Sequence, residues 1–131
     1  MSPEVVKRKL AAIAAYCGDL RRHEGISFEE FMKWHYEIER ILELLIMTAS
    51  DIVRQQLAQR GEPARSSYRG AFLRAGEVGI ISPELSRNLS LSAGLRNILV
   101  QEYDVIDDRV LHQAIPSARR DFSLFVTELS R

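Results

Sequence analysis

The sequence predicts an all-α protein, an antiparallel bundle of about five helices that forms a single domain over residues 1–131. Apolar residues recur at steps of three and four through most of the chain, as one buried helix face requires. Start and stop signals for helices separate these stretches. No segment alternates with period two, and no repeat or low-complexity tract is present, so a sheet is not expected.

The first helix should run from about residue 3 to residue 23. Ser2 and Pro3 are suited to its N-cap and its first helical position. Five residues share one side of it: Val6, Leu10, Ile13, Cys17 and Leu20. Because Cys17 is the only cysteine, an intrachain disulfide and a cysteine metal cluster are excluded. Its place on the apolar side predicts buried packing.

The second helix has the clearest start signal. Ser27 and Glu30 form a capping box, in which each side chain can bond to the backbone N–H of the other residue. Helical spacing then continues for about 33 residues to Arg60, and Gly61 ends it. Trp34 lies on the apolar side and is expected in the core. Globular helices average about 11 to 12 residues, so one of this length favours a bundle or a dimer that covers it.

Three shorter helices follow. The third fits S-S-Y-R-G-A-F-L-R-A, closed by Gly76 and Gly79, with an inward face of Tyr68, Phe72 and Ala75. Ser82 and Pro83 open the fourth, whose shared face is Leu85, Leu89, Ser92, Leu95 and Leu99. The last helix contains Pro116, which either kinks it or restarts it. Its apolar face is Leu111, Ile115, Ala118, Phe122, Phe125 and Leu129.

Composition argues for a soluble protein with no strong overall field. Lysine plus arginine and aspartate plus glutamate number 18 each, so any RNA contact must use a local patch. The longest apolar stretch is interrupted by Glu43 and falls short of the roughly 20 residues that span a bilayer. The N-terminus lacks the apolar core of a signal peptide, so a cytoplasmic location is expected.

Polar residues interrupt the apolar face near the end of the fourth helix, in the stretch G-L-R-N-I-L-V-Q-E-Y. On one helix Arg96 lies about 140° round the axis from Gln101, so the two side chains do not point at one small target. Two arrangements could bring them together. Either the helix breaks near residue 100, or two copies of the segment meet across a symmetric interface.

This stretch resembles the R-N-x-L-V-H-x-Y signature of HepT-like proteins of the HEPN superfamily. The resemblance extends to F-E-E-F-M-K-W, S-S-Y-R-G-A-F, I-I-S-P-E-L and Y-D-V-I-D-D-R-V-L, and so covers most of the chain. It implies a helical bundle that dimerises with the signature at the interface. It also implies the toxin of a type II toxin-antitoxin system, an endoribonuclease that needs no metal or cofactor. The expected partner is a minimal nucleotidyltransferase (MNT) antitoxin.

The resemblance assigns roles to four residues. Arg96 matches the catalytic arginine, Asn97 the polar residue beside it, and Tyr103 the tyrosine that the antitoxin modifies with AMP. Gln101 stands where the family has its catalytic histidine. Glutamine forms hydrogen bonds but does not titrate near neutral pH, so we expect a weak or inactive ribonuclease. The glutamine has two possible origins: an engineered inactivation, or a natural member that has lost or moved its base.

Further charged residues could contact RNA or replace the missing base. Arg65, Arg69 and Arg74, in a group with Arg54 and Arg60, could line a groove leading to Arg96, although a solvated face is the usual role of such residues. The three histidines are expected to have structural or surface roles: His23, His35 and His112. The alternative function is a non-catalytic helical module that binds a nucleotidyltransferase or RNA without cutting.

Overall fold

The computed structural model describes residues 2–63, 65–101 and 108–131, and for residues 95–101 it describes the course of the backbone only. Within these ranges every regular element is a helix, as predicted. The helices are α1 (Pro3–Arg21), α2 (Phe28–Gln59), α3 (Tyr68–Glu77), α4 (Pro83–Gln101) and α5 (Asp108–Leu129). The predicted boundaries therefore hold to within about two residues, which is the usual uncertainty of helix ends.

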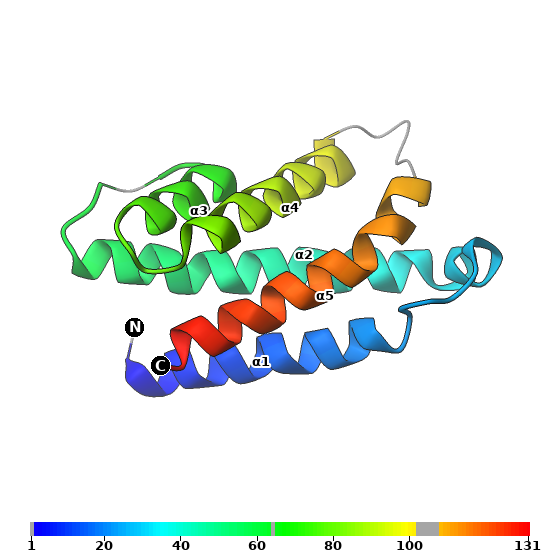
Figure 1. Ribbon diagram of the computed structural model, residues 1–131, viewed down its shortest axis with the longest axis horizontal. Helices are drawn as coiled ribbons and strands as arrows, with labels where there is room; N and C mark the ends of the chain where they lie inside the picture. The colour runs from blue at the N-terminus through cyan, green and yellow to red at the C-terminus, as the bar shows by residue number, and fades with distance from the viewer. Residues whose placement is uncertain (1, 64, 102–107) are drawn as a thin grey trace.

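Helix α2 is the central element of the bundle. It contacts each of the other four helices: α1 lies on one side, α3 and α4 lie on the other, and α5 crosses α2 from the α1 side toward α4 (Figure 1). Successive long helices run in opposite directions, as short connections dictate. The length of α2 is thus explained within one chain, since partners cover it along most of its course.

Most of the predicted inward faces form one continuous core, which contains the four fully buried phenylalanines Phe31, Phe72, Phe122 and Phe125. Cys17 is buried in this core, so the packing role predicted for it is confirmed. Burial raises the pKa of its thiol, while a hydrogen bond with Ser123 and the nearby charge of Arg119 act in the opposite direction. A thiol of this kind stays protonated and unreactive near neutral pH.

The prediction for Trp34 was wrong, because 46% of this residue is exposed. Its indole N–H donates to Glu30 Oε1 at 3.2 Å, and its ring lies 5.9 Å from that of His23. Only half of the predicted capping box forms: the backbone N–H of Glu30 donates to Ser27 Oγ at 3.1 Å, while the Glu30 carboxylate turns to Trp34. An indole has a polar edge that is more easily satisfied at the surface than in a core.

Helix α5 continues through Pro116 from Asp108 to Leu129. The proline therefore does not restart the helix. Proline cannot donate a backbone hydrogen bond and crowds the preceding turn, which bends a helix. The ribbon of α5 changes direction in this N-terminal part, which leads toward the end of α4 (Figure 1).

Gly76 was expected to close α3 but lies inside it, and Gly79, with φ of 82°, follows the helix end. A Cβ added at Gly76 would meet both Cβ and Oγ of Ser86 on α4 at 2.3 Å. The same serine donates a buried 2.8 Å hydrogen bond to the Phe72 carbonyl. The glycine therefore permits the close approach of α3 to α4.

Replacing Gly76 by alanine should lower the free energy of unfolding by about 1 to 3 kcal/mol, because the added methyl group must displace Ser86 or move a helix. The measurement is chemical denaturation followed by circular dichroism. Gly18→Ala in α1 is the matched control, since no atom lies within 4 Å of a Cβ placed there. That variant should be more stable than the parent by about 0.5 to 1 kcal/mol. Equal effects of the two changes would contradict the close contact.

Candidate active site

The candidate site lies on the last turns of α4. The helix is unbroken through Gln101, so a break near residue 100 does not bring Arg96 and Gln101 together. On this continuous helix their positions remain about 140° apart round the axis. The side chains of Arg96, Asn97 and Gln101, and all of Tyr103, lie outside what the structure describes.

The beginning of α4 is fixed by contacts with α3 and α5. Glu128 near the end of α5 accepts hydrogen bonds from the Ser82 backbone N–H at 2.7 Å and from its hydroxyl at 2.9 Å. Ser82 Oγ in turn caps the helix by accepting from the Leu85 N–H at 3.2 Å. These bonds and the contact of Ser86 with α3 fix the beginning of α4. Residues 96–101 of the signature lie at the opposite end of the same helix.

The three histidines each have a local contact, as the sequence predicted. His35 Nδ1 lies 2.6 Å from the Met32 carbonyl, and His112 Nε2 lies 2.6 Å from the Ile26 carbonyl. His23 Nε2 lies 3.7 Å from a carboxylate oxygen of Glu37. Because a carbonyl oxygen can only accept, the ring nitrogens of His35 and His112 must donate in these contacts. Each contact therefore fixes which ring nitrogen carries a proton.

A titratable group that the sequence did not single out lies on α2. Burial raises the pKa of Glu39, His35 acts in the opposite direction, and Asp108 at the start of α5 raises the pKa further. The side chain is only partly buried. Glu39 shares one side of α2 with His35 at a step of four, a pairing that the spacing could have revealed.

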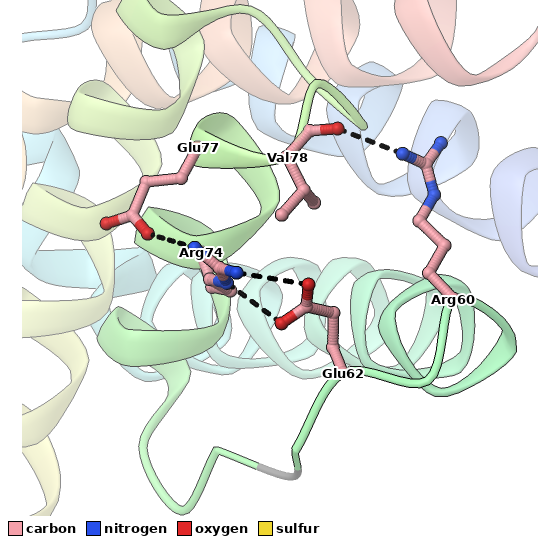
Figure 2. A network of polar contacts seen from close by, with 5 residues as sticks. All are labelled: Arg60, Glu62, Arg74, Glu77 and Val78. Carbon is pink, nitrogen blue, oxygen red and sulfur yellow. Dashed lines mark hydrogen bonds and ion pairs between the residues drawn. The ribbon is translucent and has the colours of Figure 1, made fainter.

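Two arginines of the group, Arg60 and Arg74, make polar contacts that join neighbouring segments (Figure 2). Arg74 makes a bidentate ion pair with Glu62, at 2.9 and 3.0 Å, and a third bond to Glu77 at 2.7 Å. These carboxylates raise the pKa of its guanidinium, which therefore stays charged. Arg60 donates to the Val78 carbonyl at 2.9 Å. Both arginines thus bind the end of α2 and the segment after it to α3.

The remaining arginines of the group differ in exposure: Arg54 is partly buried, whereas Arg65 and Arg69 are exposed. The guanidinium of Arg54 lies 5.0 Å from the centre of the Tyr68 ring, a cation–π contact. Arg65 and Arg69 are exposed on the segment before α3 and on its first turn. Exposed arginines of this kind can contact phosphate, whereas the guanidinium of Arg74 is already engaged by two carboxylates.

The described ranges contain no group of three or more histidine, cysteine, aspartate or glutamate side chains that could hold a metal ion. None of the helices, over the residues that are described, is long and apolar enough to cross a membrane.

Comparison with known proteins connects this site to a family. Residues 13–129 match the family model described as ribonuclease HepT-like. The tRNA nuclease HepT of Aphanizomenon flos-aquae is 30% identical over 99% of this chain and 90% of its own length. The mRNA nuclease HepT of Shewanella oneidensis is 33% identical over 68% of this chain and 64% of its own length.

Solved structures show the same fold. A tri-AMPylated HEPN toxin of Shewanella oneidensis, in complex with an MNT antitoxin, superposes with a TM-score of 0.86 at 21% identity, covering 99% of this chain and 98% of that one. The cytosolic protein YutE of Bacillus subtilis, of unknown function, gives 0.83 at 15% identity, over 99% and 89%. From the family match and the extent of the sequence identity, the chain belongs to the HepT-like ribonuclease family.

Proposed function

We propose that the protein is the toxin of an HEPN/MNT toxin-antitoxin system, an endoribonuclease weakened by Gln101. The observation that supports this most directly is the signature R-N-I-L-V-Q-E-Y, of which residues 96–101 form the end of α4, in a chain of the HepT-like family. Relatives named as tRNA and mRNA nucleases support RNA as the substrate class. A structural neighbour in complex with an MNT antitoxin supports a nucleotidyltransferase as the partner.

The proposed reaction needs no metal or cofactor. The 2′-hydroxyl of the RNA attacks the neighbouring phosphate and expels the 5′-oxygen of the next nucleotide. Arg96 stabilises the negative charge that develops on the phosphoryl oxygens, and Asn97 assists in holding the phosphate. A proton must leave the 2′-hydroxyl and another must reach the departing oxygen. Gln101 cannot exchange these protons, because an amide does not titrate near neutral pH.

We further propose that the active form is a homodimer. Because α4 is continuous through Gln101, positions 96 and 101 of one chain lie about 140° apart round the same helix. A two-fold axis near the end of α4 would place Arg96 of one copy beside position 101 of the other. This arrangement is the second of the two that the sequence left open.

Arg65 and Arg69 are proposed as phosphate contacts that guide the RNA. Alanine at both positions should weaken RNA binding at every sequence and make it less sensitive to salt. The slope of log affinity against log salt should fall in magnitude by about 0.7 for each single-strand phosphate contact that is lost. Fluorescence anisotropy with a labelled single-stranded RNA measures the slope. Arg74→Ala is the control, since that arginine is held by Glu62 and Glu77 and should leave the slope unchanged.

The experiment that tests the proposed function is cleavage of transfer RNA and bulk RNA by the parent and by Gln101→His. Cleavage by the histidine variant alone supports a ribonuclease whose proton-transfer group is missing. If neither protein cuts either RNA, the non-catalytic binding module is the better description. Cleavage by the parent at the same rate would show that proton transfer does not depend on position 101.

A further inference from the structure

A small hollow lies between α4 and α5, before the signature in the chain. Its volume is about 210 Å³. Helix α4 contributes Asn88, Leu91 and Ser92 to its walls, and α5 contributes Ser117, Arg120 and Asp121. Pockets that enclose whole drug-sized ligands measure roughly 300 to 1,000 Å³, so this one suits a single ring system.

Asp121 is the unusual member of this lining. Its side chain is only 7% exposed, yet its polar contacts are few and long. Its Oδ1 accepts from the Asn88 amide at 3.4 Å and lies 3.6 Å from Nε of Arg120. Within the described residues, Oδ2 has no hydrogen-bond partner. Buried carboxylates normally have strong hydrogen bonds, so this one has capacity for a donor that enters the hollow.

The walls around Asp121 offer the other contacts that a flat polar ring needs. Arg120, with 67% of its side chain exposed, provides a guanidinium plane at the rim. Leu91, 70% exposed on α4, provides an apolar surface. Proteins that read single-stranded RNA form hydrogen bonds to the edges of unstacked bases and stack the base faces on aromatic side chains or arginine guanidinium planes. Here Arg120 offers the guanidinium plane, and Leu91 offers van der Waals contact. The hollow therefore combines edge contacts with face contacts.

The position of the hollow relates it to the signature. Asn88, Ser92 and Arg96 follow one another in α4 at steps of four, which places them along one side of the helix. At a rise of 1.5 Å per residue, the Cα atoms of Ser92 and Asn88 lie about 6 and 12 Å before that of Arg96. A base that occupies the hollow thus belongs to a nucleotide near the one whose phosphate reaches Arg96.

We propose that this hollow is a subsite that reads a guanine base of the RNA, with Asp121 as the residue that determines specificity. The proposal rests on the proposed ribonuclease function. Guanine is the RNA base that presents two adjacent donors, N1–H and the N2 amino group, on its pairing edge. These donors match the two oxygens of one carboxylate, so that N1–H and N2–H bond to Asp121 while the ring lies against Leu91 and Arg120.

The first test is binding of GMP, AMP, CMP and UMP to the parent protein, measured by calorimetry or by NMR titration. GMP should bind more tightly than the other three. Asp121→Asn should remove about 5- to 150-fold of this preference, the range of one bidentate base contact. Asp51→Asn, an exposed carboxylate paired with Lys9 on another face, is the matched control and should leave the preference unchanged. Equal binding of all four nucleotides would overturn the proposal.

A stability measurement separates recognition from packing. Burial raises the pKa of Asp121, so the folded protein holds this proton more tightly than the unfolded chain does. The carboxylate then lowers stability as the pH rises through its pKa, and Asp121→Asn should be at least as stable as the parent at neutral pH. Loss of stability in the amide variant, together with unchanged nucleotide preference, would assign Asp121 to packing of α4 against α5 instead.

Cleavage in the Gln101→His background distinguishes failure of the subsite from failure of the proposed function. Short RNAs that differ at one position should be cut faster with guanine there, and Asp121→Asn should remove the difference without abolishing cleavage. Cleavage with no base preference would reject the subsite and keep the ribonuclease. No cleavage at all would reject the ribonuclease, and the GMP titration would still decide the subsite. If Asp121→Asn instead changes the oligomeric state in light scattering, the hollow is a subunit contact.

Discussion

Replacing Gln101 by histidine should raise the rate of RNA cleavage by about 100- to 10,000-fold, the usual contribution of a general acid or base. Imidazole can accept the proton of the 2′-hydroxyl and can donate one to the departing 5′-oxygen near neutral pH. The amide of Gln101 can do neither. The rate should be measured with purified protein and a labelled transfer RNA under single-turnover conditions.

The dependence of this rate on pH identifies the new group. The histidine variant should show a titration near the ordinary imidazole pKa of about 6.5, whereas residual cleavage by the parent should lack it. Arg96→Ala in the histidine background is the control, because it removes stabilisation of charge while leaving the imidazole in place. A gain that survived this second change would point to a contaminating nuclease. No gain in the first variant would place the proton-transfer group elsewhere.

The helices could be predicted because their signals are local. Serine caps, a continuous apolar stripe and a glycine stop determine where α2 begins and ends, whatever it packs against. Trp34 could not be placed in this way, since its position on the edge of the stripe leaves its ring free to turn toward Glu30. Gly76 was misread for the same reason: its neighbour Ser86 belongs to another helix, which periodicity does not identify.

Part of the candidate site could be predicted from the sequence, and part could not. Arg96, Asn97, Gln101 and Tyr103 were found through resemblance to a family, and no property of their spacing alone assigns a role in catalysis. The ion pair of Arg74 with Glu62 joins α3 to the segment after α2, and residue type alone does not identify this partner.

Asp121 did leave a signal in the sequence. It stands three residues after Ala118 and four before Phe125, at positions that belong to the buried face of α5. A carboxylate there requires a partner, and its weak contacts are visible only once α4 has been placed beside it.

Replacing Tyr103 by phenylalanine should let the Gln101→His toxin escape an MNT partner supplied in catalytic amounts with ATP. The phenyl ring preserves packing but has no hydroxyl to which AMP can be attached. Each AMP group adds a negative phosphodiester close in the chain to Arg96, and so competes with RNA phosphate for the same charge. RNA cleavage after incubation should therefore be strongly reduced for the tyrosine protein and nearly unchanged for the phenylalanine variant.

Tyr36→Phe is the matched control, since this tyrosine on α2 is 78% exposed and so open to a modifying enzyme. That variant should still be neutralised. Varying the amount of the partner separates modification from simple binding, because one enzyme can modify many toxin molecules but can cover only one. If the Tyr103→Phe toxin is inhibited only by an equimolar amount of the partner, the inhibition is due to binding of the partner and not to modification. A variant that is still inhibited by catalytic amounts is modified elsewhere, and Tyr103 is then not the residue through which the partner acts.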